Sequence, residues 1–248
     1  LKTEVKPLPS APLRDLLRRT PAGDLPVPGP DGRQAWQAYG RPWAGPADKP
    51  RVAAVVVDLG LDKAATEAAI ARLPPEVTLA FSPYAPGLDK WVKKARDHGH
   101  EVLVGLPAER TGQPDVDPGP FALTQAATPE ANLGRVETVL ARAPGAAGLI
   151  LPAGPLAAAA QMPTLMLAVR ERGLMVVGDV AVPPDQAPPL VPITQVADLD
   201  GFRESIDLRL NQVTLAGRAR GRALVVVQAR PLSLERLAQW LADLPAQG

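Results

Sequence analysis

Carboxylates that follow apolar segments are the first candidates for chemistry in this chain. Asp58 stands at the end of an apolar, β-branched run, and Glu109 and Asp179 occupy equivalent places after two later runs. A hydrolytic metal site needs about three His or carboxylate ligands and an open position for water. No histidine accompanies these acids, so only a hard cation held by carboxylates, or a carboxylate pair of the glycosidase type, would suit them. The competing interpretation, which we favour, is that each acid caps a helix or accepts hydrogen bonds from loop amides.

Polar and aromatic side chains near the same segment ends complete the candidate set. Arg110 follows Glu109 directly, and Gln228 and Arg230 follow the last apolar run. Either arginine could act as an electrostatic clamp beside the carboxylates, whereas Gln228 offers an amide without a titrating group. Tyr84 could stack on a sugar ring, although we favour packing within its own loop.

The two histidines of the chain, His98 and His100, flank Gly99 in a pattern that looks like a metal motif. They lie between a predicted helix and a predicted strand, at the end of the fold opposite the carboxylates. We therefore interpret both histidines as structural, with Gly99 ending the helix. The sequence contains no glycine-rich phosphate loop and no G-x-S-x-G elbow, so neither nucleotide binding nor serine-hydrolase chemistry has support.

Alternating strand and helix signals must position these residues. From residue 51 onward, apolar runs predict seven strands, at 52–57, 77–81, 101–106, 148–151, 174–177, 196–199 and 223–227. The segments between them predict helices, with Pro163 interrupting the one expected over 155–172. Seven β-then-α units favour a parallel sheet in a closed or nearly closed barrel, and a doubly wound open sheet is the alternative. In either fold, chemistry belongs at the carboxyl ends of the strands.

The first 50 residues differ from the rest of the chain. They are rich in proline and glycine, give one helical hint at 12–19, and contain Trp36, Tyr39 and Trp43. We expect residues 1–50 to form an N-terminal arm and residues 51–248 to form the barrel. The aromatic rings would fasten the arm to the barrel, or the arm would link the barrel to a removed anchor.

The composition excludes several classes of protein. The chain has 248 residues, no cysteine and a formal net charge of +1. Without cysteine it forms no disulfide, thiolate metal site or thiol nucleophile. The balanced charge lacks the basic footprint of a nucleic-acid-binding protein. No apolar run is long enough to span a bilayer.

Several segments resemble the divergent polysaccharide deacetylase family, the YibQ-like branch of the NodB-related proteins. The segments VTLAFSPYAP at 77–86, GHEVLVGLPAE at 99–109 and DPGPFAL at 117–123 follow the family's order, as do 172–174 and 230–237. The resemblance covers the chain from residue 51 to its end. It implies a NodB-like deformed (β/α)7 barrel with an extended proline-rich N-terminal arm. It also implies a periplasmic location, free or membrane-anchored, and an ancestral metal-dependent removal of acetyl groups from amino sugars.

The resemblance further implies that the ancestral catalytic site is degenerate. Active relatives have Asp-Asp at the end of the first strand, as base and metal ligand, where this chain has Val57-Asp58. Histidines at later strand ends correspond to Gly105, Pro152 and Gln228, whereas Glu109 and Asp179 are kept. We therefore expect no intact catalytic set, no cofactor and no metal, with Asp58 the one retained ligand position of the first motif. Without metal, nothing lowers the pKa of an attacking water toward neutrality.

Two functional hypotheses follow, with a third beside them. The first is an inactive cell-envelope protein that binds a glycan such as peptidoglycan, or a cell-wall-remodelling protein, through the former active-site cleft. The second is an active carbohydrate deacetylase or hydrolase that uses relocated acidic residues. The third is a scaffold for protein interactions. An open cleft with converging carboxylates around Asp58 would favour chemistry or glycan binding, and one filled by Val57, Leu151 and Pro152 would favour a scaffold.

Overall fold

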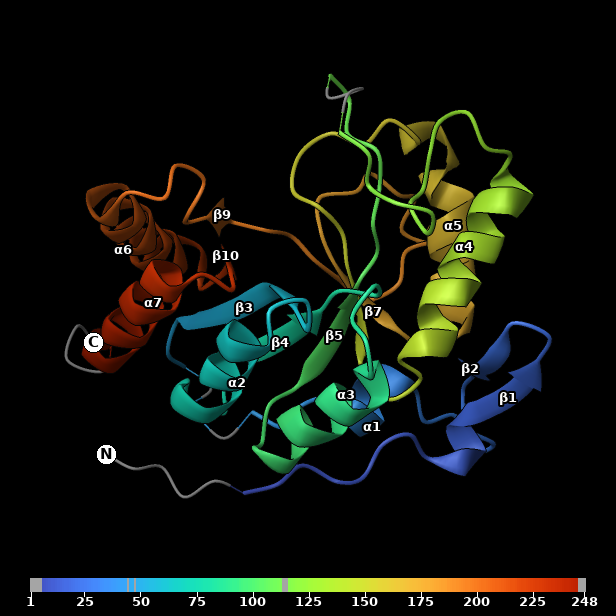
Figure 1. Ribbon diagram of the computed structural model, residues 1–248, viewed down its shortest axis with the longest axis horizontal. Helices are drawn as coiled ribbons and strands as arrows, with labels where there is room; N and C mark the ends of the chain where they lie inside the picture. Colours follow the sequence, from blue (N-terminus) through green and yellow to red (C-terminus); the bar gives the residue numbers. More distant parts are fainter. Residues whose placement is uncertain (1–5, 44, 47, 113–115, 245–248) are drawn as a thin grey trace.

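The computed structural model describes residues 6–43, 45–46, 48–112 and 116–244, which Figure 1 shows as a ribbon. The outermost ends of the predicted arm and barrel domains, at 1–5 and 245–248, lie outside the described residues, as do residues 44, 47 and 113–115.

The central element is an eight-stranded parallel sheet with the order β8-β7-β6-β5-β4-β3-β10-β9. Its strands are β3 (Arg51–Leu59), β4 (Thr78–Phe81), β5 (Val102–Gly105), β6 (Gly148–Ile150), β7 (Met175–Val177), β8 (Leu190–Val191), β9 (Gln195–Val196) and β10 (Arg222–Gln228). Strands β3 to β8 follow one another around the sheet, and the last strand, β10, pairs with the first, β3. That neighbour relation is the one a barrel requires. The curled sheet confirms the predicted barrel class over the open doubly wound alternative.

The sixth predicted strand, 196–199, overlaps the structure only at Val196, the last residue of β9, and a short strand that was not predicted, β8, precedes it at the opposite edge of the sheet. β8 pairs with β7, and β9 pairs with β10 after only a short connection, so one stretch of chain bridges both edges. The strand ends at Val196, earlier than predicted, because Asp198 turns its carboxylate to the next strand instead of continuing the ladder.

Helices surround the sheet. They are α1 (Ala35–Tyr39), α2 (Lys63–Arg72), α3 (Leu88–Asp97), α4 (Pro129–Arg142), α5 (Met162–Glu171), α6 (Arg203–Arg220) and α7 (Pro231–Asp243), with 3-10 turns η1 (Arg14–Leu16) and η2 (Ala159–Gln161). Asp62 caps α2 and Thr128 caps α4, each accepting a hydrogen bond from a backbone N–H. The helix predicted over 155–172 begins only at Met162, because Pro163 suits a first helical turn and not an interior one.

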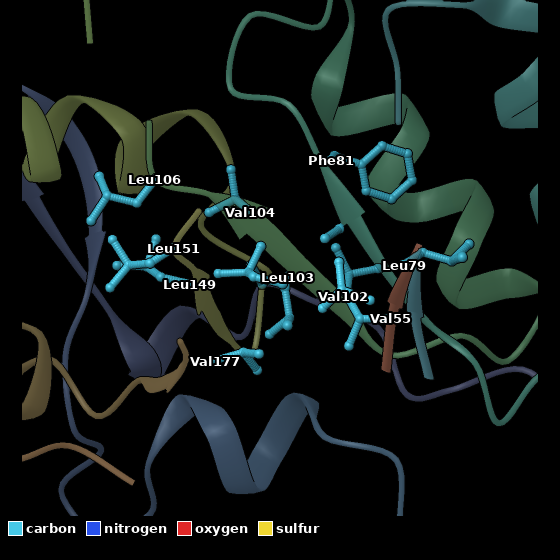
Figure 2. Packing of buried hydrophobic residues seen from close by; sticks show 14 of the residues in the cluster. Val55, Leu79, Phe81, Val102, Leu103, Val104, Leu106, Leu149, Leu151 and Val177 are labelled. Atoms are coloured by element: carbon cyan, nitrogen blue, oxygen red, sulfur yellow. The ribbon is translucent and has the colours of Figure 1, made fainter. Parts of the chain in front are cut away.

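The core fills the space inside and around the strands. Figure 2 shows side chains from neighbouring strands meeting there, among them Val55, Leu79, Leu103, Leu149 and Val177. Three consecutive residues of β5, Val102 to Val104, are fully buried. Both faces of that strand are therefore covered, as in α/β barrels.

The arm lies along the amino end of the sheet and beside α4 (Figure 1). The helix predicted over 12–19 is wrong: the chain makes η1 and then a hairpin of β1 (Leu17–Thr20) and β2 (Gly23–Pro26). Leu16 of η1 and Leu25 of β2 are buried in the common core. Tyr39 is 1% exposed and fastens the arm, whereas Trp43 is 54% exposed and lies against the guanidinium of Arg51.

The histidines have structural surroundings, as predicted. His100 is 1% exposed, and its ring nitrogens lie 2.9 Å from the carbonyl of Val77 and 3.1 Å from that of Ile70. Gly99 has φ 84 and follows the last turn of α3. Such a left-handed residue ends helices without strain when it is glycine.

Candidate functional site

A cavity of about 510 Å³ opens at the carboxyl ends of the strands. Apolar side chains from several strand ends form most of its wall, including Val57, Phe81, Leu106, Leu151 and Val226. The cleft is therefore open. Val57, Leu151 and Pro152, which would have favoured a scaffold had they filled the cleft, line its sides instead. Ligands of α/β barrels bind at this end of the sheet.

The backbone aims Asp58 into this cavity. β3 pairs regularly with β4 up to Val56, and the register then shifts before Leu59. Asp58 lies in that bulge with φ 61, and it is the one described non-glycine residue with a positive φ. Bulges at barrel rims redirect a side chain, and aspartate is among the few residues that tolerate the left-handed conformation. The following turn is held by Thr66, whose hydroxyl accepts a hydrogen bond from Gly60 N–H at 2.8 Å.

Charged groups around the cavity act on the Asp58 carboxyl. The cavity wall removes part of its hydration, and this desolvation raises the pKa of Asp58, although the residue remains exposed to the cavity. Arg110 and, at longer range, Arg230 oppose the rise, while Asp198 adds to it. Asp58 therefore contacts water in the cavity, and its pKa lies above the ordinary value of an aspartate.

Of the sequence-predicted residues, Asp58, Tyr84, Arg110 and Gln228 line the cavity together. Within the described part of the chain, the side chains of Asp58, Arg110 and Gln228 form no hydrogen bond or ion pair. Polar groups surrounded by an apolar wall and lacking protein partners are available to a ligand.

Tyr84 is partly committed to the loop between β5 and α4. Its hydroxyl donates to the Pro118 carbonyl at 2.9 Å and accepts from Phe121 N–H at 3.1 Å. Its ring stacks on Phe121, with centroids 5.0 Å apart. One face of the Tyr84 ring is thus covered, so this residue holds a cavity wall in place.

Glu109, Asp179 and Arg230 are not among the residues that line the cavity. Glu109 accepts a hydrogen bond from Gln125 N–H at 2.9 Å, and Asp179 accepts one from Ile193 N–H at 3.2 Å. Both carboxylates therefore fix loops. Arg230 acts on Asp58 only through its charge.

Sequence reasoning missed Asp198, which organises the end of the site. Asp198 is 1% exposed and accepts hydrogen bonds from Gln228 N–H at 2.9 Å and from the Ser233 hydroxyl at 2.6 Å. It thereby links the end of β9 to β10 and to the first turn of α7. Its signal in the sequence was a lone acid between Ala197 and Leu199, inside a segment interpreted as a buried strand.

The residues of the cavity do not suit the divalent metal that the fold family implies. Among the described residues, no group of three or more His, Cys, Asp or Glu side chains could hold a metal ion. The cavity offers one carboxylate, Asp58, and places Arg110 beside it. A nearby guanidinium disfavours binding of a metal cation, so the described residues do not support metal-dependent hydrolysis at this site.

Replacing Asp58 by asparagine should stabilise the protein near neutral pH. Asparagine keeps the shape and tolerates φ 61, but removes a charge whose pKa the fold raises. Below the carboxyl's ordinary pKa, about 4, aspartate is neutral in both folded and unfolded states. As pH rises past that value, the unfolded state ionises first and the wild type loses stability. The gain in Tm for Asp58→Asn should therefore be larger at pH 7 than at pH 4. Asp24→Asn, at an exposed site in β2, is the control, and equal gains for both variants would contradict this account.

Comparison with known proteins agrees with this fold. The model of the divergent polysaccharide deacetylase family matches residues 54–248. The structure is similar to that of an uncharacterized protein, ATU2773 from Agrobacterium tumefaciens C58, with 30% identity, a TM-score of 0.83, and coverage of 91% of this chain and 96% of that one. It is also similar to a BA3943 mutant, described as a CE4 family pseudoenzyme with restored enzymatic activity, at 12% identity and a TM-score of 0.47, covering 82% of this chain and 65% of that one. No curated protein sequence matches the chain.

The family match extends over nearly all of the barrel and leaves out the arm. It confirms the resemblance seen in the sequence and the NodB-like α/β class of the fold. No helix in the described part of the chain is long and apolar enough to cross a membrane. On the family match and on the barrel that carries it, the chain belongs to the divergent polysaccharide deacetylase family.

Proposed function

We propose that this chain is a non-hydrolytic member of its family, which binds a cell-envelope ligand in the cavity at the carboxyl ends of the strands. The ligand would be a glycan such as peptidoglycan or a cell-wall-remodelling protein, met on the periplasmic side. One observation carries the proposal: the cavity is open and, among the residues that the structure describes, it holds unpaired polar groups and a single carboxylate where hydrolysis would need a full ligand set.

The alternative of an active hydrolase with relocated acids finds less support. General acid–base catalysis needs an acid and a base that both lie within hydrogen-bond reach of the reacting groups of the substrate. Glu109 and Asp179 hold loop amides and do not line the cavity, so among the described residues no second carboxylate lines the cavity wall with Asp58. Glu109 and Asp179, two acids retained from the family pattern, therefore stabilise loops around the cavity.

The periplasmic location is also a proposal, and it rests on the resemblance to the NodB-related proteins. The absence of cysteine is compatible with an oxidising compartment, since no thiol needs protection there.

Metal content and acetate release test the proposal directly. Protein purified without chelator should contain no stoichiometric transition metal, and Asp58→Asn should leave that content unchanged. Incubation with tetra-N-acetylchitotetraose or with isolated peptidoglycan should release no acetate above a buffer blank. Stoichiometric metal that disappears in Asp58→Asn, or acetate released in proportion to protein, would overturn the non-hydrolytic assignment.

A further inference from the structure

The mouth of the cavity carries exposed aliphatic side chains from three separate loops. Leu61, Val116 and Leu199 line the cavity, yet they are 59%, 60% and 69% exposed. They follow β3, β5 and β9 respectively, so the sequence does not group them. Apolar groups gathered at a rim mark a surface that is covered in a complex. A ligand confined to the cavity would leave most of this rim in water, so the occupant must extend beyond the mouth.

The unpaired polar groups of Asp58, Arg110 and Gln228 match a ligand that has both a hydrogen-bond donor and an acceptor. Ionised Asp58 only accepts, Arg110 only donates, and the Gln228 amide does both. A peptide group supplies one N–H and one C=O side by side. A fatty acid supplies no donor when ionised, and its carboxylate would face that of Asp58.

The wall chemistry favours an amino-acid side chain over a sugar. Sugars present a hydroxyl on nearly every carbon and need a polar lining. Here the Ser82 hydroxyl accepts from Tyr84 N–H at 3.2 Å and retains a single O–H donor, and the Tyr84 hydroxyl is committed to its loop, so few hydroxyl partners remain. The remaining wall is aliphatic or proline over most of its extent. Burying hydroxyls there without hydrogen-bond partners would weaken binding, whereas burying a Leu or Phe side chain would strengthen it.

We infer that the cavity binds a peptide segment of a protein partner, with one apolar side chain inside and its flanking peptide groups against Asp58, Arg110 and Gln228. The exposed leucines and valine of the rim would cover the neighbouring residues of that segment. This inference rests on the proposed function and names the ligand class of the same site.

Titration with small amides tests the inference on the whole chain. Methyl-labelled protein is titrated with N-acetyl-leucine methylamide and N-acetyl-phenylalanine methylamide, and the methyl resonances of Val57, Leu61, Val116 and Leu199 are followed by NMR. We expect saturable shifts at these methyls. N-acetyl-glycine methylamide keeps both amides but lacks the apolar side chain, so it should bind at least about tenfold more weakly.

Substitutions at the cavity rim and at Asp58 test where the amides bind and which groups bind them. Leu199→Glu should weaken binding at least about fivefold, because it places a charge at the mouth. Leu215→Glu is the matched control, since Leu215 is 62% exposed on α6 and does not line the cavity. Asp58→Gly removes the acceptor at a position where φ 61 suits glycine and should weaken binding, whereas Asp58→Asn keeps an acceptor and should bind more tightly than Asp58→Gly.

The outcomes separate the inference from the proposed function. Saturable shifts with tetra-N-acetylchitotetraose and none with the amino-acid amides would overturn the peptide assignment and leave non-hydrolytic binding intact. If Leu199→Glu and Leu215→Glu weaken amide binding equally, the placement of the binding site at the cavity is overturned. If no probe shifts the methyl resonances, the inference of a peptide-binding cavity is overturned. Acetate released from the chitotetraose during the titration would overturn the proposed function itself.

Discussion

Replacing His100 by leucine should lower the free energy of unfolding by about 2–4 kcal/mol, although leucine is apolar and of similar size. The ring of His100 is buried between the Val77 carbonyl, at 2.9 Å, and the Ile70 carbonyl, at 3.1 Å. Ile70 lies in the last turn of α2, where its carbonyl would normally accept from the residue four positions later. That residue is Pro74, which has no N–H. With its proton on Nε2, the neutral histidine provides the donor that the helix lacks, and leucine would leave the Ile70 carbonyl unsatisfied.

The same histidine should make the protein sensitive to mild acid. Burial lowers the pKa of His100, and the two carbonyls, which favour the imidazolium ion, offset this only in part. An unfolded histidine takes up a proton near pH 6.5, whereas the folded one does so only at lower pH. The unfolded state thus binds more protons, and wild-type stability should fall as pH drops from about 7 through 6. His100→Leu should lack this component of the fall.

Urea unfolding at pH 7.5 and at pH 5.5 measures both effects, and His98→Leu is the control. His98 is half-buried, and its Nδ1 lies 2.9 Å from the Lys94 carbonyl within the same helix. The chain has only these two histidines, so the comparison isolates the buried one. If both leucine variants lose the same free energy, or if His100→Leu retains the full acid sensitivity, the capping role assigned to His100 is wrong.

The fold was predictable where its signals are local. The apolar runs that became β3, β5 and β10 stand out because strands buried on both faces contain few polar residues. Helix starts at Asp62 and Thr128 were likewise readable, since a capping side chain acts within one turn. The structure of the arm was not predictable, because its 3-10 turn and hairpin are stabilised by burial of Leu16 and Leu25 in the common core.

The candidate site was predictable only as far as strand ends allow. A residue that follows a parallel strand must lie at the carboxyl edge of the sheet, which placed Asp58, Arg110 and Gln228 near one cavity. The direction of a side chain depends on loop geometry that no spacing records. Asp58 points inward because of a bulge with φ 61, whereas Glu109 turns to Gln125 N–H within its own loop. The converging carboxylates considered from the sequence therefore do not converge.

Replacing Arg96 by methionine should destabilise the protein by about 3 kcal/mol and loosen the arm. Arg96 is 3% exposed on α3, and its guanidinium donates to the Tyr39 carbonyl at 2.8 Å and to the Pro9 carbonyl at 2.8 Å. It also lies 5.6 Å from the centroid of the Tyr39 ring. Burial lowers the pKa of Arg96, yet arginine remains charged at all ordinary pH values. Methionine would fill similar space but leave the carbonyl of buried Tyr39 without a donor and release the more exposed Pro9 carbonyl.

Limited proteolysis and hydrogen exchange should show that this loss concentrates in the arm. Residues 8–40 should exchange and be cleaved faster in Arg96→Met, while the strands around the cavity exchange at rates set by the lower global stability. Lys93→Met is the control, because Lys93 lies on the same helix and forms only an exposed ion pair with Asp97. Because the arm contacts the amino end of the barrel and the cavity opens at the carboxyl end, Arg96→Met should leave the affinity for N-acetyl-leucine methylamide unchanged under conditions where the protein is folded. Weakened binding in the folded variant would show that the arm and the cavity are coupled through α3, against the separation argued from their positions.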